Sequence, residues 1–192
     1  SWADPDFIKP IKKSQNKFLI DKGLSNKFIC LYSGNQGKCH DLDTILKASK
    51  ILKDFQNIVF IFIGNGSKNS LIKRFINHEK LTNCILLNYQ EYNAIPYSLG
   101  SADVAFVTQN ETSSSLIAPS KLYGHLAAGS PIGLICPKDS FLKKLIENEK
   151  CGKWFNNNNS KDLAIWIKDL SENKHLVKKY SSNSVNLINR KF

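Results

Sequence analysis

The chain has 192 residues, of which 42% are hydrophobic, so it is long enough for one globular domain with a substantial core. No apolar run approaches the roughly 18 residues that cross a bilayer, and no signal-peptide pattern opens the chain, which predicts a cytoplasmic protein. The net charge of +11 favours acidic partners such as phosphates or anionic lipid. No aromatic and basic cluster of the RNA-binding kind is present, so nucleic acid is not an expected partner.

The chain is expected to have three parts. Residues 1–11 are extended and punctuated by proline, and we interpret them as an interdomain linker. Residues 12–170 are expected to form one globular domain, and residues 171–192 a C-terminal helix that packs toward a further domain. The chain contains no methionine and begins at Ser1-Trp2-Ala3, so we treat it as part of a longer protein.

Apolar runs and amphipathic segments follow one another along the chain. They predict strands at 27–33, 58–63, 85–87, 104–107, 132–135 and, shorter, 153–155. Helices are expected at 13–23, 68–79, 119–128 and 140–149, and one or two more are expected over 161–187. Another helix is expected to begin at a cap on Asp41, and a helix-like segment leads through Leu99 to Ala102.

Strands that alternate with helices through short connections make βαβ units, and such units build a parallel sheet. The predicted fold class is therefore α/β: a doubly wound, Rossmann-like parallel sheet of about six strands, with helices on both faces. The segment Ile58–Ile63 is apolar throughout, as expected for a strand that helices cover on both sides.

The first predicted strand runs into the glycine turn Ser33-Gly34-Asn35-Gln36-Gly37. A turn of this kind before a helix offers free backbone N–H groups to a phosphate, although a tight turn alone would need the same glycines. A second glycine turn follows at 64–66, and polar segments follow the next strands at 88–92 and 108–121. In a parallel sheet these four segments converge at the carboxyl edge, where a ligand site is expected.

Two common nucleotide motifs are absent. The spacing G-x-G-x-x-G does not occur, no acidic residue ends the second strand, and there is no P-loop, which disfavours a dinucleotide oxidoreductase. The string Asp41-Leu42-Asp43 matches a metal-binding D-x-D pattern, but its place at a helix start favours capping. The four histidines lack metal-ligand spacing, so no metal site is expected, and His40 is a candidate phosphate donor.

Several motifs occur together in a fixed order: Leu31-Tyr32-Ser33-Gly34-Asn35-Gln36-Gly37 with His40-Asp41, Phe62-Ile63-Gly64-Asn65-Gly66, Asn88-Tyr89-Gln90, Ser101-Ala102-Asp103-Val104, Pro119-Ser120-Lys121-Leu122-Tyr123-Gly124 and Ala127-Ala128-Gly129-Ser130-Pro131. In this order they resemble the C-terminal, donor-binding half of a GT-B fold, family-4 (group 1) glycosyltransferase of the bacterial surface-polysaccharide type. The resemblance covers nearly the whole chain, and it implies that residues 12–170 form a Rossmann-like nucleotide-sugar-binding domain.

The resemblance implies a retaining, hexosyltransferase-type enzyme that transfers a sugar from a nucleotide-diphosphate sugar, with UDP favoured. The acceptor would be a polysaccharide or a lipid-linked molecule, bound by an N-terminal acceptor domain that lies outside this chain. No metal or other cofactor is expected, because a lysine and helix N-termini can stabilise the charge of the departing diphosphate. Contact with an anionic membrane from the cytoplasmic side is compatible with this function. No catalytic residue is assigned within this chain, which is expected to be inactive alone.

The resemblance also implies roles for particular residues. Those expected at the diphosphate or sugar are Gly34, Asn35, Gly37, His40, Ser120 and Lys121, and those expected at the nucleobase or ribose are Gly64, Gly66, Tyr89, Gln90 and Tyr123. Many relatives carry two glutamates where this chain has Leu116 and Gly124, which leaves its ribose contact open. Two alternatives remain: a nucleotide-sugar epimerase of the same architecture, and a non-catalytic nucleotide-binding or assembly module.

Overall fold

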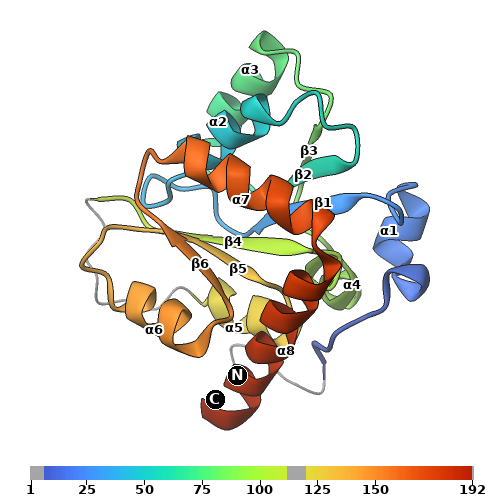
Figure 1. The fold of residues 1–192 in the computed structure, drawn as a ribbon. Helices are drawn as coiled ribbons and strands as arrows, with labels where there is room; N and C mark the ends of the chain where they lie inside the picture. The colour runs from blue at the N-terminus through green and yellow to red at the C-terminus, as the bar shows by residue number, and fades with distance from the viewer. Residues whose placement is uncertain (1–6, 112–119, 192) are drawn as a thin grey trace.

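A computed structural model describes residues 7–111 and 120–191, and its centre is a six-stranded parallel sheet (Figure 1). The strand order is β3-β2-β1-β4-β5-β6, and every neighbouring pair is parallel. The strands are β1 (Phe28–Ser33), β2 (Ile58–Ile63), β3 (Cys84–Leu87), β4 (Val104–Thr108), β5 (Ile132–Ile135) and β6 (Gly152–Phe155). The doubly wound α/β fold predicted from the sequence is confirmed.

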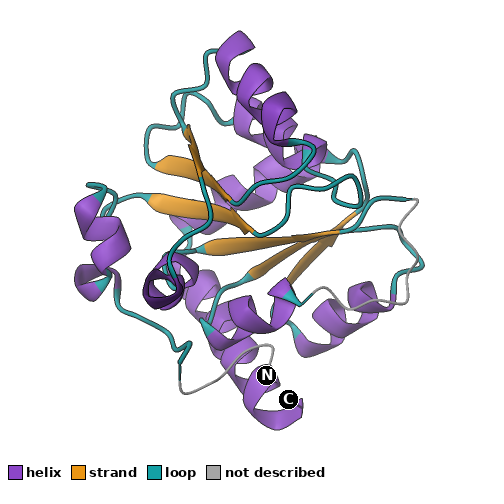
Figure 2. Ribbon diagram, turned by 180° about the vertical axis from the view of Figure 1, so that it is seen from behind, coloured by secondary structure: helices purple, strands orange, loops and turns teal. Residues whose placement is uncertain are grey.

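Helices cover both faces of the sheet, as the view from behind shows (Figure 2). The described helices are η1 (Lys13–Gln15), α1 (Lys17–Asp21), α2 (Asp43–Ile51), α3 (Asn69–His78), η2 (Tyr92–Ala94), α4 (Ile95–Leu99), α5 (Lys121–Ala127), α6 (Phe141–Glu149), α7 (Ser160–Glu172) and α8 (Lys174–Lys191). None of these helices, within the described part of the chain, is both long and apolar enough to span a bilayer.

Side chains of the central strands alternate between two hydrophobic layers, because successive residues of a strand point to opposite faces. On β1, Cys30 and Tyr32 are buried against α2 and α7, whereas Ile29 and Leu31 are buried in the layer that includes α1. The β4 residues Ala105 and Val107 join a third cluster beneath α5, α6 and α8. The sheet is therefore apolar on both faces, and its polar residues collect at the strand ends.

The sequence predicted one helix over 13–23, and this prediction is wrong in detail. Two short helices, η1 and α1, meet at Asn16, whose backbone is extended and whose side chain accepts a hydrogen bond from the Leu19 N–H. A second amide hydrogen bond joins Asn16 to the carbonyl oxygen of Tyr97, 2.9 Å away. This capping residue starts a new helix instead of continuing the first, because its own backbone leaves the helical region.

Both ends of the described chain pack on the same side of the domain. Ile8, in the segment predicted as a linker, is 7% exposed and lies in the cluster beneath α5. The C-terminal segment forms two helices that separate at Asn173, and α8 buries Ser184, Leu187 and Ile188. The contact of α8 with a further domain remains a prediction.

The chain reverses its direction of travel across the sheet between β1 and β4. It runs outward through β1, β2 and β3, and then returns to place β4 on the other side of β1. The connection after β1 therefore leads toward the β3 edge of the sheet, and the connection after β4 leads toward the β6 edge. Ligands of open α/β sheets bind in the space between two such loops.

Candidate functional site

The turn after β1 depends on close contact with the turn after β2. Gly34 and Gly64 adopt φ angles of +136° and +128°, a region that residues with a side chain rarely occupy. A Cβ atom on Gly64 would lie 2.1 Å from the Gly34 carbonyl oxygen. Gly64 is therefore needed for the two turns to touch, and the second turn supports the first. A Cβ atom on Gly34 would instead lie 3.3 Å from Lys121 Cε.

Residues 36–41 are fixed by hydrogen bonds to neighbouring loops. On the β2 side, the Gln36 N–H donates to the Asn65 carbonyl, and Lys68 Nζ donates to the His40 carbonyl at 2.8 Å. On the β4 side, the Asn110 N–H donates to the Cys39 carbonyl. The backbone that would face a phosphate is thus held from both sides.

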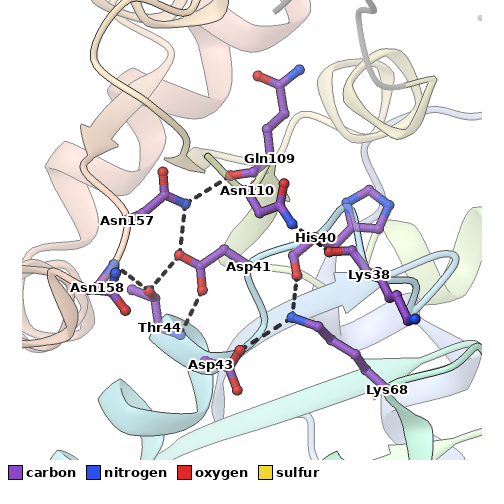
Figure 3. A network of polar contacts seen from close by, with 10 residues as sticks. All are labelled: Lys38, His40, Asp41, Asp43, Thr44, Lys68, Gln109, Asn110, Asn157 and Asn158. Atoms are coloured by element: carbon purple, nitrogen blue, oxygen red, sulfur yellow. Dashed lines mark hydrogen bonds and ion pairs between the residues drawn. The ribbon is translucent and has the colours of Figure 1, made fainter. Parts of the chain in front are cut away.

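The Asp41 carboxylate is the centre of a buried polar network (Figure 3). It accepts hydrogen bonds from the Thr44 N–H at 3.0 Å, the Thr44 hydroxyl at 2.7 Å and the Asn157 amide at 2.8 Å. The same Asn157 amide group donates to the Gln109 carbonyl at 2.9 Å. Asp41 therefore caps the start of α2, as predicted, and also ties together the loops after β1, β4 and β6.

Both carboxylates of the D-x-D string, those of Asp41 and Asp43, bind other groups of the protein. Asp41 is 7% exposed and accepts the three hydrogen bonds above, while the Asp43 carboxylate pairs with Lys68 Nζ at 3.2 Å. Among residues 7–111 and 120–191, no three His, Cys, Asp or Glu side chains gather as a metal site would require. The string acts in capping and loop attachment in this structure.

Lys121 reaches across from the first residue of α5 to the turn after β1. Its Nζ atom donates to the Tyr32 hydroxyl at 2.8 Å and lies 3.5 Å from His40 Nε2. The other ring nitrogen, His40 Nδ1, is 2.9 Å from the Thr108 carbonyl oxygen. These contacts bring together β1, the loop after it, the end of β4 and the start of α5.

The site is basic, and burial perturbs its groups. Loss of solvent lowers the pKa of Lys121 from 10.5 to about 7. Burial lowers the pKa of His40 as well, and the nearby Lys121 charge lowers it further. No salt bridge joins Lys121 to a carboxylate within the described residues. An anion bound here would supply the counter-charge that residues 7–111 and 120–191 do not place beside Lys121.

The residues predicted to bind the nucleobase lie at one side of this centre. Tyr89 is 57% exposed, and its hydroxyl is 3.4 Å from the Asn65 carbonyl, so its ring lies near the second glycine turn. Gly66 packs against the first turn, because a Cβ atom there would lie 2.6 Å from Asn35 Oδ1. The Gln90 amide donates to the Asn88 carbonyl at 2.8 Å and stays within its own loop.

Three other predicted positions are less closely joined to the centre. Ser120 is exposed and makes no side-chain capping hydrogen bond to α5. Tyr123 packs against the hydrophobic cluster beneath α5. The Gly37 carbonyl oxygen accepts a hydrogen bond from the His40 N–H at 3.2 Å, and Gly37 so shapes the turn.

Two residues discussed from the sequence, Leu116 and Pro119, lie outside the described residues. Gly124 is buried, and a Cβ atom there would lie 3.2 Å from Leu99 Cδ1.

Sequence reasoning assigned no role to Tyr32, Thr108 or Asn157. Each lies at a strand end or just after it, where a polar side chain interrupts an apolar run, and that position was the available signal. Their partners could not be read from the sequence, because Tyr32 and Lys121 are separated by 89 positions and Asp41 and Asn157 by 116.

With this geometry established, comparison with known proteins gives the family. The family model described as "Glycosyl transferases group 1" matches residues 14–186, most of the chain. The chain belongs to this family. A curated relative, WbjE of Pseudomonas aeruginosa, named as a probable glycosyltransferase, is 27% identical over 177 residues, which are 90% of this chain and 43% of WbjE. The chain spans less than half the length of the curated relatives that it matches.

Solved structures share the fold, among them that of LpcC, which is named as a group 1 family glycosyl transferase. The C-terminal domain of LpcC from Francisella tularensis matches with a TM-score of 0.75 and 17% identity, covering 98% of this chain and 97% of that domain. HepE of Anabaena, solved in complex with UDP, matches with a TM-score of 0.82 and 16% identity, covering 98% of this chain and 51% of HepE. This group 1 chain therefore has the fold of a C-terminal GT-B domain.

Proposed function

We propose that this group 1 chain is the donor-binding domain of a retaining glycosyltransferase whose donor is a nucleotide-diphosphate sugar, with UDP as the nucleotide. One observation carries the proposal: Lys121 points at the glycine turn after β1 and, within the described residues, pairs with Tyr32 and His40 and with no carboxylate. A partly buried lysine without an anionic partner is costly unless a ligand supplies the negative charge.

The chemistry of sugar transfer fits this arrangement. When the bond between the sugar and the diphosphate breaks, negative charge grows on the departing diphosphate. Groups that stand in place before the reaction stabilise that charge without reorganising. Lys121 and the backbone N–H groups of Asn35 and Gly37 are such groups, whereas the N–H groups of Gly34 and Gln36 already donate to the Ile63 and Asn65 carbonyls. With these groups at the diphosphate, the proposed transfer needs no metal ion.

The structural relatives support the choice of nucleotide. HepE has been solved with UDP, with UDP-glucose and with UDP and glucose, and TarM of S. aureus has been solved in a complex that includes UDP. In the proposal, the diphosphate contacts both the turn at 34–37 and Lys121 Nζ, and the uracil lies toward Tyr89, whose exposed ring can stack on a base.

The proposal extends to the whole enzyme. An N-terminal domain, outside this chain, would bind a polysaccharide or lipid-linked acceptor and complete the active site. The net charge of +11 would favour peripheral contact with an anionic membrane surface, where lipid-linked acceptors are found. The chain alone would then bind the donor weakly and transfer nothing.

Calorimetric titration of the chain with UDP, UDP-N-acetylglucosamine and ADP tests the proposal. We expect both uridine nucleotides to bind, and Lys121→Ala to weaken UDP binding by about 1 to 3 kcal/mol, because a charge-assisted contact with the diphosphate is lost. The matched control is Lys47→Ala on α2, an exposed lysine that should leave binding unchanged. Absence of heat with every nucleotide at millimolar concentration would reject the donor-binding function.

A further inference from the structure

The contacts of Lys121 form a hydrogen-bond chain whose direction is fixed at both ends. At one end the Tyr32 hydroxyl donates to the Asn35 carbonyl oxygen. At the other end His40 Nδ1 lies 2.9 Å from the Thr108 carbonyl oxygen. A carbonyl oxygen only accepts, so Tyr32 donates its hydrogen to Asn35, and His40 carries its hydrogen on Nδ1.

This direction determines what Lys121 can do. The Tyr32 oxygen and His40 Nε2 are both left as acceptors facing Lys121 Nζ, at 2.8 Å and 3.5 Å. Lys121 must therefore point two hydrogens at these two atoms. A neutral amine has two hydrogens and one lone pair, whereas an ammonium group has a third hydrogen. When Lys121 is neutral, the third position on Nζ is a lone pair, which repels an anion. When Lys121 is protonated, the third position is a charged N–H donor.

From this geometry we propose that binding of the diphosphate at this site is coupled to uptake of one proton from solvent by Lys121 Nζ. The inference rests on the proposed function and adds how the site is regulated. Donor affinity then depends on pH in the physiological range, and the ammonium group formed on binding is the one that faces the diphosphate oxygens.

The neighbouring titratable groups leave Lys121 as the group that takes up the proton. Burial raises the pKa of Tyr32 well above its usual value, and burial lowers the pKa of His125, one helical turn along α5, to about 3. His40 is held neutral by burial and by Lys121, and the pKa of Lys121 is itself lowered to about 7.

Two charged side chains of the surrounding loops, Asp41 and Lys68, are engaged elsewhere. Lys68, at the start of α3, pairs with Asp43 at 3.2 Å. Figure 3 shows the Asp41 carboxylate turned toward Thr44 and Asn157, while the His40 ring points to the other side. On the β3 side, the Tyr89 hydroxyl lies 3.4 Å from the Asn65 carbonyl.

The test is calorimetric titration of the chain with UDP at pH 7.5 in two buffers of different ionisation enthalpy, which measures the number of protons taken up. At this pH the terminal phosphate of UDP, with a pKa near 6, is almost fully ionised, so it contributes little. We expect uptake of about 0.7 proton, and a fall in affinity of about eightfold from pH 7.5 to pH 8.5, because a Lys121 pKa of about 7 leaves the free amine mostly neutral.

Three variants identify the group that is protonated. Lys121→Arg keeps a cation that does not lose its proton, so UDP should bind without proton uptake and with little dependence on pH. His40→Gln keeps an acceptor for Lys121 and a donor for Thr108 but cannot titrate, so proton uptake should persist. Lys47→Met, the control at an exposed lysine on α2, should behave like the unmodified chain.

Each result decides the matter. UDP binding by the unmodified chain without proton uptake would overturn the inference and leave the donor-binding function standing. Uptake that disappears in His40→Gln would place the proton on the imidazole and also overturn it. If Lys121→Arg does not fold or bind, the residual UDP binding of Lys121→Met must show no uptake. A chain that binds no UDP would contradict the proposed function itself, and the inference with it.

Discussion

The two sides of the site are built in different ways. The loop after β1 is fixed by many contacts: its glycine turn rests on the turn after β2, and residues 36–41 are hydrogen-bonded to the loops after β2 and β4. The opposite side contributes Lys121 from the start of α5, where Ser120 makes no capping bond. One side is a rigid backbone, and the other is a single long side chain.

The difference indicates what each side contributes. A backbone held by the loops after β2 and β4 can present its remaining N–H groups without reorganisation, which suits the part of a ligand that must be placed accurately. A lysine on a flexible stem supplies charge and adjusts to its position. Substitutions in the fixed loop should therefore act mainly on stability, and substitutions of Lys121 mainly on ligand binding.

Gly64→Ala should have the largest effect on the fixed side. The new Cβ atom would meet the Gly34 carbonyl oxygen at 2.1 Å in a backbone conformation with φ of +128°, so the two turns must separate. We expect the free energy of unfolding to fall by about 4 kcal/mol in urea denaturation. Gly23→Ala is the control, since Gly23 has φ of +65° and no atom within 4 Å, and it should cost about 1 kcal/mol. Equal losses in the two variants would show that contact between the turns is unimportant.

Asp41→Ala should have the next largest effect. It leaves the Thr44 N–H and the Asn157 amide without their buried acceptor, and it detaches the loop after β6 from the start of α2. We expect a loss of about 3 kcal/mol in the free energy of unfolding. Asp54→Ala, at an exposed position after α2, should change it by less than about 0.5 kcal/mol. A small effect of Asp41→Ala would mean that the loops are held by their backbone contacts alone.

Lys121→Met should have the smallest effect on stability, and in the opposite direction. The pKa of Lys121 is about 7 in the folded chain and 10.5 in a solvated lysine, so between these values the unfolded chain binds more protons. The stability of the unmodified chain therefore rises with pH from about 7 to 10. This pKa difference corresponds to roughly 4 to 5 kcal/mol at pH 6.5, and the loss of the hydrogen bond to Tyr32 offsets part of it. The net stabilisation should be about 2 kcal/mol at pH 6.5, and less at pH 10. Thermal unfolding at both pH values measures this, and a variant that is less stable at pH 6.5 would contradict it.

Local features of the sequence predicted most of the fold. Apolar strands such as Ile58–Ile63 and the periodic helices between them follow from side-chain spacing, so all six strands were expected close to where they lie. The error at 13–23 has a local cause, since Asn16 starts a new helix where the apolar pattern suggested one that continues. The capping role of Asp41 was also predicted, because a carboxylate next to a helix start has few other uses.

The sequence by itself determined the alternating elements, the glycine turns and the polar strand ends, since these depend on residues close together in the chain. Only the tertiary structure decided which of them meet. The contact of Lys121 with Tyr32 spans 89 positions, and that of Asn157 with Asp41 spans 116. Such partners are set by the order of strands in the sheet, which brings distant loops to one edge. The perturbed pKa of Lys121 likewise comes from burial by neighbours that the local sequence does not contain.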